Sequence, residues 1–245
     1  TRRFAQGFQF DSVYAWSKSI DTLSSEFGGN ANQTDPRNLR AQRGPSDYDV
    51  RHRFTLSGLW DLPIFRGRRD GLGSVLGGWQ LNGILTAHTG FPWTPKHCND
   101  LNRDGQGCFE RAAGYFGGAL SPSNSNFTQP GGIFPGNAAN GLGTRRYFDI
   151  TTPGTPGVGR NTFRGPRYFD VDMSLAKQFD FHGLLGLGEG TNLEIRANVF
   201  NLFNTLNLSP FNYGDENTFI FNPNFGRALG ALSGRVVEFQ GRFRF

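Results

Sequence analysis

The residues best suited to chemistry in this sequence lie in an acidic segment between its two cysteines. Residues 98–108 read CNDLNRDGQGC, so that Asp100, Asn102 and Asp104 alternate and Gly105 follows. Alternating oxygen-bearing side chains can converge on one hard cation such as calcium, and a glycine permits the sharp turn that this requires. An arginine stands where an EF-hand carries its closing glutamate. Two interpretations therefore stay open, a calcium site and an Asx-rich turn without an ion.

The two cysteines of the chain, Cys98 and Cys108, enclose this segment. In an oxidising compartment, a pair this close in a loop forms a disulfide. The alternative is a metal-binding thiol pair, but the spacing is not CxxC and only His97 is a further ligand nearby. We expect the disulfide, which would stiffen the candidate ion site.

The remaining polar residues do not form a catalytic constellation. No Ser/His/Asp order, zinc-ligand spacing or phosphate-binding loop stands out, so we expect no enzymatic activity and no cofactor other than the candidate calcium. The net charge of +5 comes from scattered arginines, whereas nucleic-acid binding needs a basic stripe with stacking aromatics. We expect no nucleic-acid partner. The histidines are dispersed, at His52, His88, His97 and His182.

The composition favours an all-β protein. Of the 245 residues, 35 are glycine and 25 are phenylalanine, and aromatic residues make up 14%. Many turns together with many β-forming residues are typical of all-β folds. The sequence contains no run of about 18 apolar residues, which excludes a transmembrane helix.

Residues 234–245 alternate with period two. The odd positions carry Val237, Phe239, Phe243 and Phe245, and the even positions are mostly charged or polar. Such a strand lies between two different environments. In an outer-membrane barrel these are lipid and lumen. A half-buried strand of a soluble β-sandwich is the alternative.

The same alternation predicts five earlier strands, which makes about six in all. The connections between them alternate between long and short, with long loops at about 21–49, 92–166 and 206–232. Barrels carry long loops on one rim and short turns on the other, whereas a β-sandwich gives no reason for this order. We therefore predict an antiparallel transmembrane β-barrel segment. The five strands are expected at 8–16, 53–62, 79–89, 168–179 and 192–203, with a further short strand within 147–150.

Some aromatic and acidic residues allow further hypotheses. The tryptophans lie near predicted strand ends, as expected of aromatic belts at the two membrane interfaces; they are Trp16, Trp60, Trp79 and Trp93. Side chains in the last long loop could contact a ligand, although we favour a solvated loop, because nothing in one sequence selects these residues. These residues are Tyr213, Asp215, Glu216 and Phe219.

Several segments resemble TonB-dependent outer-membrane receptors of the Oar-like, carboxypeptidase-regulatory-like-domain branch. They are residues 14–21 (YAWSKSID), 43–54 (RGPSDYDVRHRF), 78–85 (GWQLNGIL) and 198–204 (NVFNLFN), together with the terminal Phe245. The resemblance covers most of the chain and is weakest in 109–159. It implies a location in the outer membrane of a Gram-negative bacterium. Phe243 and Phe245 resemble the C-terminal aromatic signal that the barrel-assembly machinery reads.

The resemblance also implies a function and partners. Such receptors are 22-stranded barrels with a plugged lumen, so residues 1–245 would form the C-terminal part of the barrel, without a plug domain. The whole receptor would import a scarce nutrient, using energy passed from the TonB complex through its N-terminal part. Lipid and lipopolysaccharide would surround the wall. The alternative is a structural or adhesive outer-membrane surface protein, a split or degenerate barrel that transports nothing.

Overall fold

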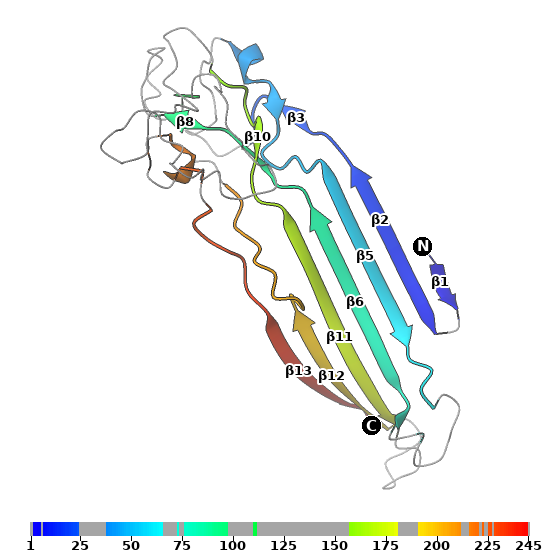
Figure 1. Cartoon of the computed structure of the whole chain (residues 1–245). Coiled ribbons are helices and arrows are strands. Elements are labelled where there is room, and N and C mark those ends of the chain that lie inside the picture. The colour runs from blue at the N-terminus through cyan, green and yellow to red at the C-terminus, as the bar shows by residue number, and fades with distance from the viewer. Residues whose placement is uncertain are drawn as a thin grey trace.

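The chain forms one large antiparallel sheet with packed loops at one end (Figure 1). The computed structural model describes residues 2–5, 7–24, 38–65, 73, 76–97, 110–111, 157–180, 191–211, 216–220, 222, 225–226 and 228–244. The sheet has seven strands in the order β1-β2-β5-β6-β11-β12-β13. The edge strand β1 (Arg2–Ala5) is short. All pairings in this sheet are antiparallel.

The six long strands confirm the six strands predicted from the alternation. Their bounds are β2 Phe8–Trp16, β5 His52–Asp61, β6 Trp79–His88, β11 Tyr168–Asp180, β12 Asn192–Phe200 and β13 Val236–Arg244. β12 ends three residues before the predicted position because Asn201 adopts the left-handed region with φ 52°. Its N–H leaves the ladder and donates to Asp172 Oδ1 at 2.9 Å.

The strand register brings most of the large apolar residues of all six strands to one face. Leu85 of β6, for example, lies opposite Leu56 of β5 and Val171 of β11. Its chain neighbour Ile84 lies on the other face, opposite Ser57 and Asp172. We call the two surfaces the apolar face and the polar face. The apolar face carries Phe8, Phe10, Tyr14, Trp16, Phe54, Leu56, Trp60, Leu81, Leu85, Phe169, Val171, Met173, Leu175, Phe179, Leu193, Ile195, Val199, Val237, Phe239 and Phe243.

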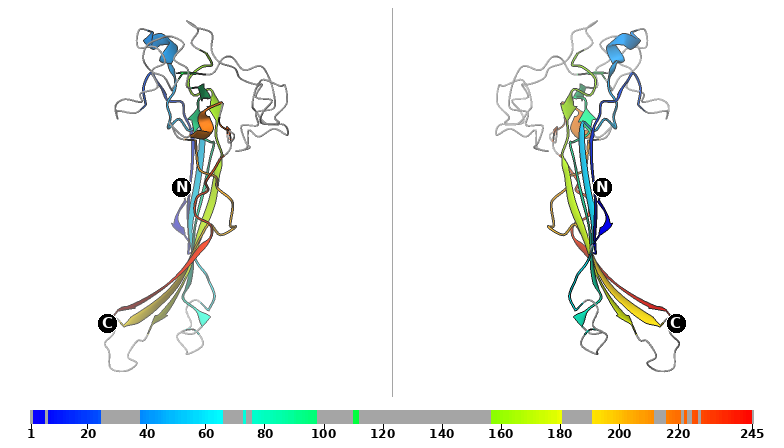
Figure 2. Two further views of the ribbon diagram at one scale, coloured as in Figure 1. Left: turned by 90° about the vertical axis from the view of Figure 1, so that its left-hand side faces the viewer. Right: turned by 90° about the vertical axis from the view of Figure 1, so that its right-hand side faces the viewer.

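The described strands form a single twisted layer, as the edge-on views in Figure 2 show. On the apolar face Phe239 is 80% exposed and Trp16 is 72% exposed. The buried hydrophobic residues lie outside the strands of this sheet, except for Ala176. A soluble sandwich would bury one face of each sheet against the other. The sandwich interpretation is therefore wrong for this chain.

Lys177 is the one charged residue on the apolar face of the six long strands, and it lies near the end that is away from the packed loops. Its ammonium group donates to the carbonyl oxygens of Gly77 and, at 2.9 Å, Gln178. The same group lies 4.4 Å from the ring centre of Phe179 and 6.0 Å from that of Trp79. A long side chain can thus cover apolar surface while its charge is satisfied at the strand end.

Trp93 corrects one of the sequence predictions. Trp16, Trp60 and Trp79 lie on the apolar face near strand ends, as expected. Trp93 instead lies in β7 (Pro92–Trp93), is 3% exposed, and belongs to the loop core. The chain can turn there because Gly90 approaches another backbone closely: a Cβ at Gly90 would lie 2.0 Å from a carbonyl oxygen. Proximity to a strand end therefore did not indicate an interface position.

The long connections, 17–51, 89–167 and 201–235, leave the sheet at the same end (Figure 1). Their described parts contain three small two-stranded sheets and two short 3-10 helices. These are β3 (Ile20–Asp21) with β4 (Gly44–Pro45), β7 with β10 (Phe163–Arg164), β8 (Lys96–His97) with β9 (Glu110–Arg111), η1 (Leu39–Gln42) and η4 (Glu216–Thr218). The predicted short strand within 147–150 lies outside the described residues. No helix in the described part of the chain is long and apolar enough to span a membrane.

The two faces of β6 should respond differently to the same charge in a lipid bilayer. Leu85→Arg places the charge on the apolar face and is expected to destabilise the folded protein by about 2–4 kcal/mol. Ile84→Arg is the matched control, since it places the charge one residue away on the polar face and should change stability little. Urea midpoints of both variants in lipid vesicles measure the difference. Equal losses would contradict the assignment of the faces.

Candidate functional site

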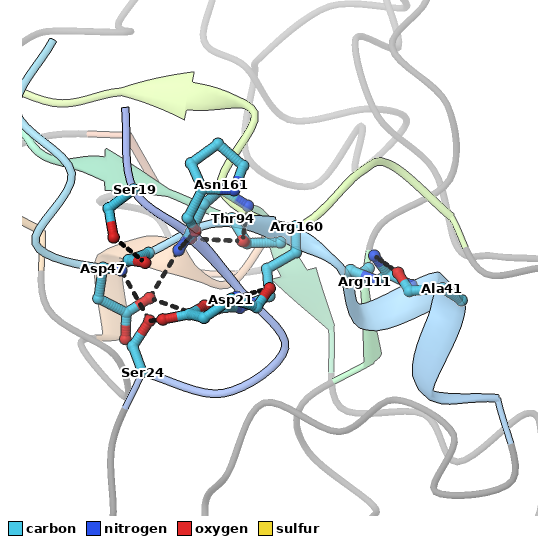
Figure 3. A network of polar contacts seen from close by, with 11 residues as sticks. Ser19, Asp21, Ser24, Ala41, Asp47, Thr94, Arg111, Arg160 and Asn161 are labelled. Carbon is cyan, nitrogen blue, oxygen red and sulfur yellow. Dashed lines mark hydrogen bonds and ion pairs between the residues drawn. The ribbon is translucent and has the colours of Figure 1, made fainter. Parts of the chain in front are cut away.

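A buried arginine holds the first and second long connections together (Figure 3). The side chain of Arg160 is 2% exposed, and its guanidinium group pairs with Asp21 and, at 3.5 Å, with Asp47. The Ser24 hydroxyl bridges the two acids: it donates to Asp21 Oδ2 and accepts from the Asp47 N–H, both at 2.8 Å. Burial alone would raise the pKa of Asp21, but the hydrogen bonds and charge of Arg160 hold it below its usual 3.8.

The next residue, Asn161, adds a second set of contacts between the same segments. Its Nδ2 donates to the carbonyl of Pro45 at 2.8 Å and to Asp47 Oδ1 at 2.6 Å. The Thr94 hydroxyl accepts from the Asn161 N–H at 2.7 Å and donates to Oδ1 of the same residue at 3.0 Å. Asn161 has φ 54°, a conformation that asparagine tolerates better than most residues. Residues of both connections are thereby fixed around Asp47.

A second ion pair holds Asp49, two residues after Asp47 in the chain. Asp49 is 1% exposed and pairs with Arg164, and its Oδ1 accepts from the Ser19 N–H at 2.6 Å. Arg164 also donates to the Asp49 carbonyl at 2.6 Å. Burial alone would raise the pKa of Asp49, but the bonds from Arg164 and Ser19 outweigh it, and the pKa lies below 3.8. The carboxylate is therefore ionised at neutral pH.

Residues 46–49, which the ion pairs of Arg160 and Arg164 hold on either side, form a tight turn. The Asp49 N–H donates to the Ser46 carbonyl at 2.9 Å, which leaves Asp47 and Tyr48 at the corner. Ser46 is itself held by Ser19, through a backbone bond of 3.0 Å and a contact of 2.8 Å between the hydroxyls. Ser46 is fully buried, whereas Tyr48 is 61% exposed. The turn thus presents one aromatic ring from a fixed backbone.

An aromatic cluster joins the second and third long connections. The ring of Trp93 lies 4.9 Å from that of Phe211, 5.7 Å from that of Phe225 and 6.0 Å from that of Phe163. Trp93, Phe211 and Phe225 are all buried, and Ile220 is completely buried. The Ile220 N–H donates to the Lys96 carbonyl at 2.8 Å. The loops therefore have a hydrophobic core of their own.

A pocket of about 340 Å³ opens where the three connections meet. The first connection contributes Asp47 and Tyr48, the second contributes Phe91 and Asn161, and the third contributes Phe211. Its lining combines aromatic rings with a carboxylate, an amide and hydroxyl groups. Such a combination of apolar walls and a few fixed polar groups is typical of small-molecule sites. We take this pocket as the candidate functional site.

His97 lies in the loop core next to this pocket's Lys96. It is completely buried, and burial lowers its pKa from 6.5 to about 4, although a hydrogen bond with the Arg111 backbone acts in the opposite direction. The imidazole is therefore neutral at pH 7. Arg111 in turn donates to the Ala41 carbonyl at 3.0 Å (Figure 3), so that β9 is also tied to the first connection.

The candidate calcium ligands and the cysteines lie outside the described residues. This applies to Asp100, Asn102, Asp104, Cys98 and Cys108. The calcium site and the disulfide stay predictions.

The other residues singled out from the sequence have separate outcomes. Tyr213, Asp215 and the terminal Phe245 also lie outside the described residues, whereas Phe243 is on the apolar face opposite Leu193. Glu216 is exposed, and Phe219 forms a bridge with Lys96. The pocket is lined by their neighbour Thr218 and by neither of the two.

Of the residues that line the pocket, the sequence analysis singled out Trp93 alone, and for a different role. Asp47 and Tyr48 were quoted only within 43–54, as part of the resemblance. The turn-forming composition of 46–49 (SDYD) was a usable local signal. Arg160 gave no such signal, because its acidic partner Asp21 is 139 residues away in the chain.

With the strands and the pocket in place, comparison with known proteins gives the family. The family model described as "Outer membrane beta barrel domain" matches residues 1–238. The chain belongs to the outer membrane β-barrel domain family. It is therefore a protein of the bacterial outer membrane, in which lipid covers the apolar face and the packed loops lie at one rim. No curated protein and no solved structure matches it.

Removing the buried arginine should loosen the loops of this outer-membrane domain. Arg160→Met leaves Asp21 and Asp47 without their cation, and we expect a loss of about 2–3 kcal/mol in local stability. The loss falls short of a fully buried pair because both acids keep some contact with water. Hydrogen exchange of 17–24 and 44–50 measures it. Arg40→Met is the control, since Arg40 is exposed in the same connection; equal exchange in both variants would refute the role of Arg160.

The loop core should also lose stability in mild acid. Because His97 resists protonation when folded, its contribution is complete above the unfolded pKa of 6.5 and is lost as the pH falls towards about 4. The full difference amounts to about 3 kcal/mol. Below pH 3.8, protonation of Asp21 and Asp49 adds a further loss. Hydrogen exchange of 92–97 against pH measures this, and in His97→Gln the loss between pH 6.5 and 4 should disappear. A slope that persists in this variant would assign the effect to another group.

Proposed function

We propose that the chain forms part of the wall and the ligand-capturing surface loops of a TonB-dependent outer-membrane receptor that imports a scarce nutrient. The observation that carries this proposal is the meeting of all three long connections at one pocket. A purely structural wall has no need for loops that share a hydrophobic core and enclose a cavity of mixed chemistry. The resemblance of four segments to such receptors supports the same function.

The edges of the sheet support a barrel that is larger than this chain. β1 and β13 lie at opposite ends of the strand order, and no pairing among the described residues joins them. All nine residues of β13 are exposed. In hydrocarbon an unpaired strand edge is untenable, because no water satisfies its backbone groups. The proposal therefore includes additional strands that complete a barrel of 22 strands, as in these receptors, and a plug inside the lumen.

The proposed partners follow from these surfaces. Lipid and lipopolysaccharide would surround the apolar face, and the remaining strands and the plug would complete the receptor. The TonB complex would act through the N-terminal part of the receptor and not through the residues described above. Phe243, together with Phe245, would be read by the barrel-assembly machinery.

The proposal is tested on the outer-membrane polypeptide that carries this sequence. Its intact mass should be several times the 27.1 kDa of this chain, and it should bind the purified periplasmic domain of TonB. Deletion of its N-terminal segment should abolish that binding without removing the barrel from the membrane. A polypeptide of 27.1 kDa that does not bind TonB would overturn the transport function and would favour the structural or adhesive alternative.

A further inference from the structure

Tyr48 is exposed, whereas the residues next to it in the chain are buried or half-buried. Among residues 44–49, Ser46 and Asp49 are buried, the others are half-buried, and Tyr48 alone is exposed. Ser46 and Asp49 are fixed by hydrogen bonds to Ser19 and Arg164. The backbone from which the Tyr48 ring projects is therefore fixed beside the pocket. Tyr48 is therefore held at the pocket with its apolar ring surface in contact with water, which is unfavourable in free energy.

The groups around the pocket have a definite chemistry. Phe91 and Phe211 provide aromatic walls beside Tyr48. Asp47 uses its Oδ1 for Asn161 and Arg160, whereas its Oδ2 has no hydrogen bond among the described residues. The Asp47 side chain is 35% exposed. A ligand in the pocket would thus meet aromatic rings and one open, charged hydrogen-bond acceptor.

The Asp47 carboxylate already has a cation beside it. Arg160 faces Asp47 at 3.5 Å, which opposes the entry of a cationic group. Lys96 also lines the pocket, but the residue is only 3% exposed and offers no open charge to an anion. An anionic ligand would lose its hydration without a free counter-charge to replace it, and a cationic ligand would lie close to the Arg160 guanidinium group. The pocket therefore favours a neutral ligand whose hydroxyl groups donate and whose ring face is apolar.

We propose that this pocket binds one or two rings of a neutral saccharide, with a sugar face on the Tyr48 ring and a hydroxyl group donating to Asp47 Oδ2. Its volume of about 340 Å³ suits a ligand of that size, since small-molecule sites span about 300–1,000 Å³. A hydrogen bond to a carboxylate is stronger than one between neutral groups, and it gives orientation to the ring. The inference rests on the proposed role of the loops in ligand capture, but it does not require coupling to TonB.

The test uses the complete outer-membrane protein, purified in detergent and applied to an array of neutral oligosaccharides that includes maltotriose, cellotriose and xylotriose. Sugars that bind are then titrated by calorimetry. Tyr48→Ala should weaken binding about tenfold, because the loss of one aromatic contact has about that effect. Tyr48→Phe keeps the ring face and should retain most of the affinity. Asp47→Asn should weaken binding, because the charge of the acceptor is lost.

The matched control is Leu229→Ala, a residue that is also 61% exposed but does not line the pocket. It should leave binding unchanged. Absence of binding to every neutral sugar on the array would overturn the inference, as would binding that Tyr48→Ala does not weaken. A calorimetric titration with a cationic amine such as spermidine that shows tighter binding than any of the sugars would overturn it as well. Because binding is measured without TonB, a failure here is distinct from a failure of the transport proposal.

Discussion

The structure depends on the constraint that a chain in hydrocarbon must satisfy its backbone hydrogen bonds within itself. The antiparallel ladders of the long strands meet it for the interior of the sheet. The apolar face then needs no protein partner, since lipid covers it, and the usual core between two layers is not required. Exposed rings such as Phe239 are stable for this reason. Burial of apolar side chains moves to the loops, where water would otherwise reach them.

The loops meet the opposite requirement, because in water they must pack in order to hold a shape. They combine a hydrophobic cluster around Trp93 with two buried ion pairs, made by Arg160 and Arg164. A buried ion pair contributes little net stability, because desolvation offsets much of the attraction. It does restrict the arrangement, since either arginine without its acid would be costly. We infer that these pairs determine which loop conformation forms and that the aromatic cluster supplies most of the stability.

Sequence reasoning predicted the six long strands well, because the alternation of apolar and polar residues within each strand shows which face each residue occupies. It left Lys177 unexplained, because the carbonyls that satisfy its charge are set by the turn geometry around Gly77 and Gly78. It misplaced Trp93, since a strand end and a loop core look alike in one sequence. The pocket could not be predicted, because Asp49 and Arg164 meet across 115 residues of chain. Contacts of this kind have no local period.

Aromatic rings are exposed in this protein for two different reasons. Those on the apolar face are in contact with the lipid of the outer membrane, as the family assignment implies. Tyr48 lies between β4 and β5, outside the strands of the large sheet and beside the pocket of the loops, where lipid does not explain its exposure. Its turn is fixed from both sides by Arg160 and Arg164, so mobility does not explain it either. An exposed ring on a fixed turn beside a pocket is best explained by a ligand that covers it.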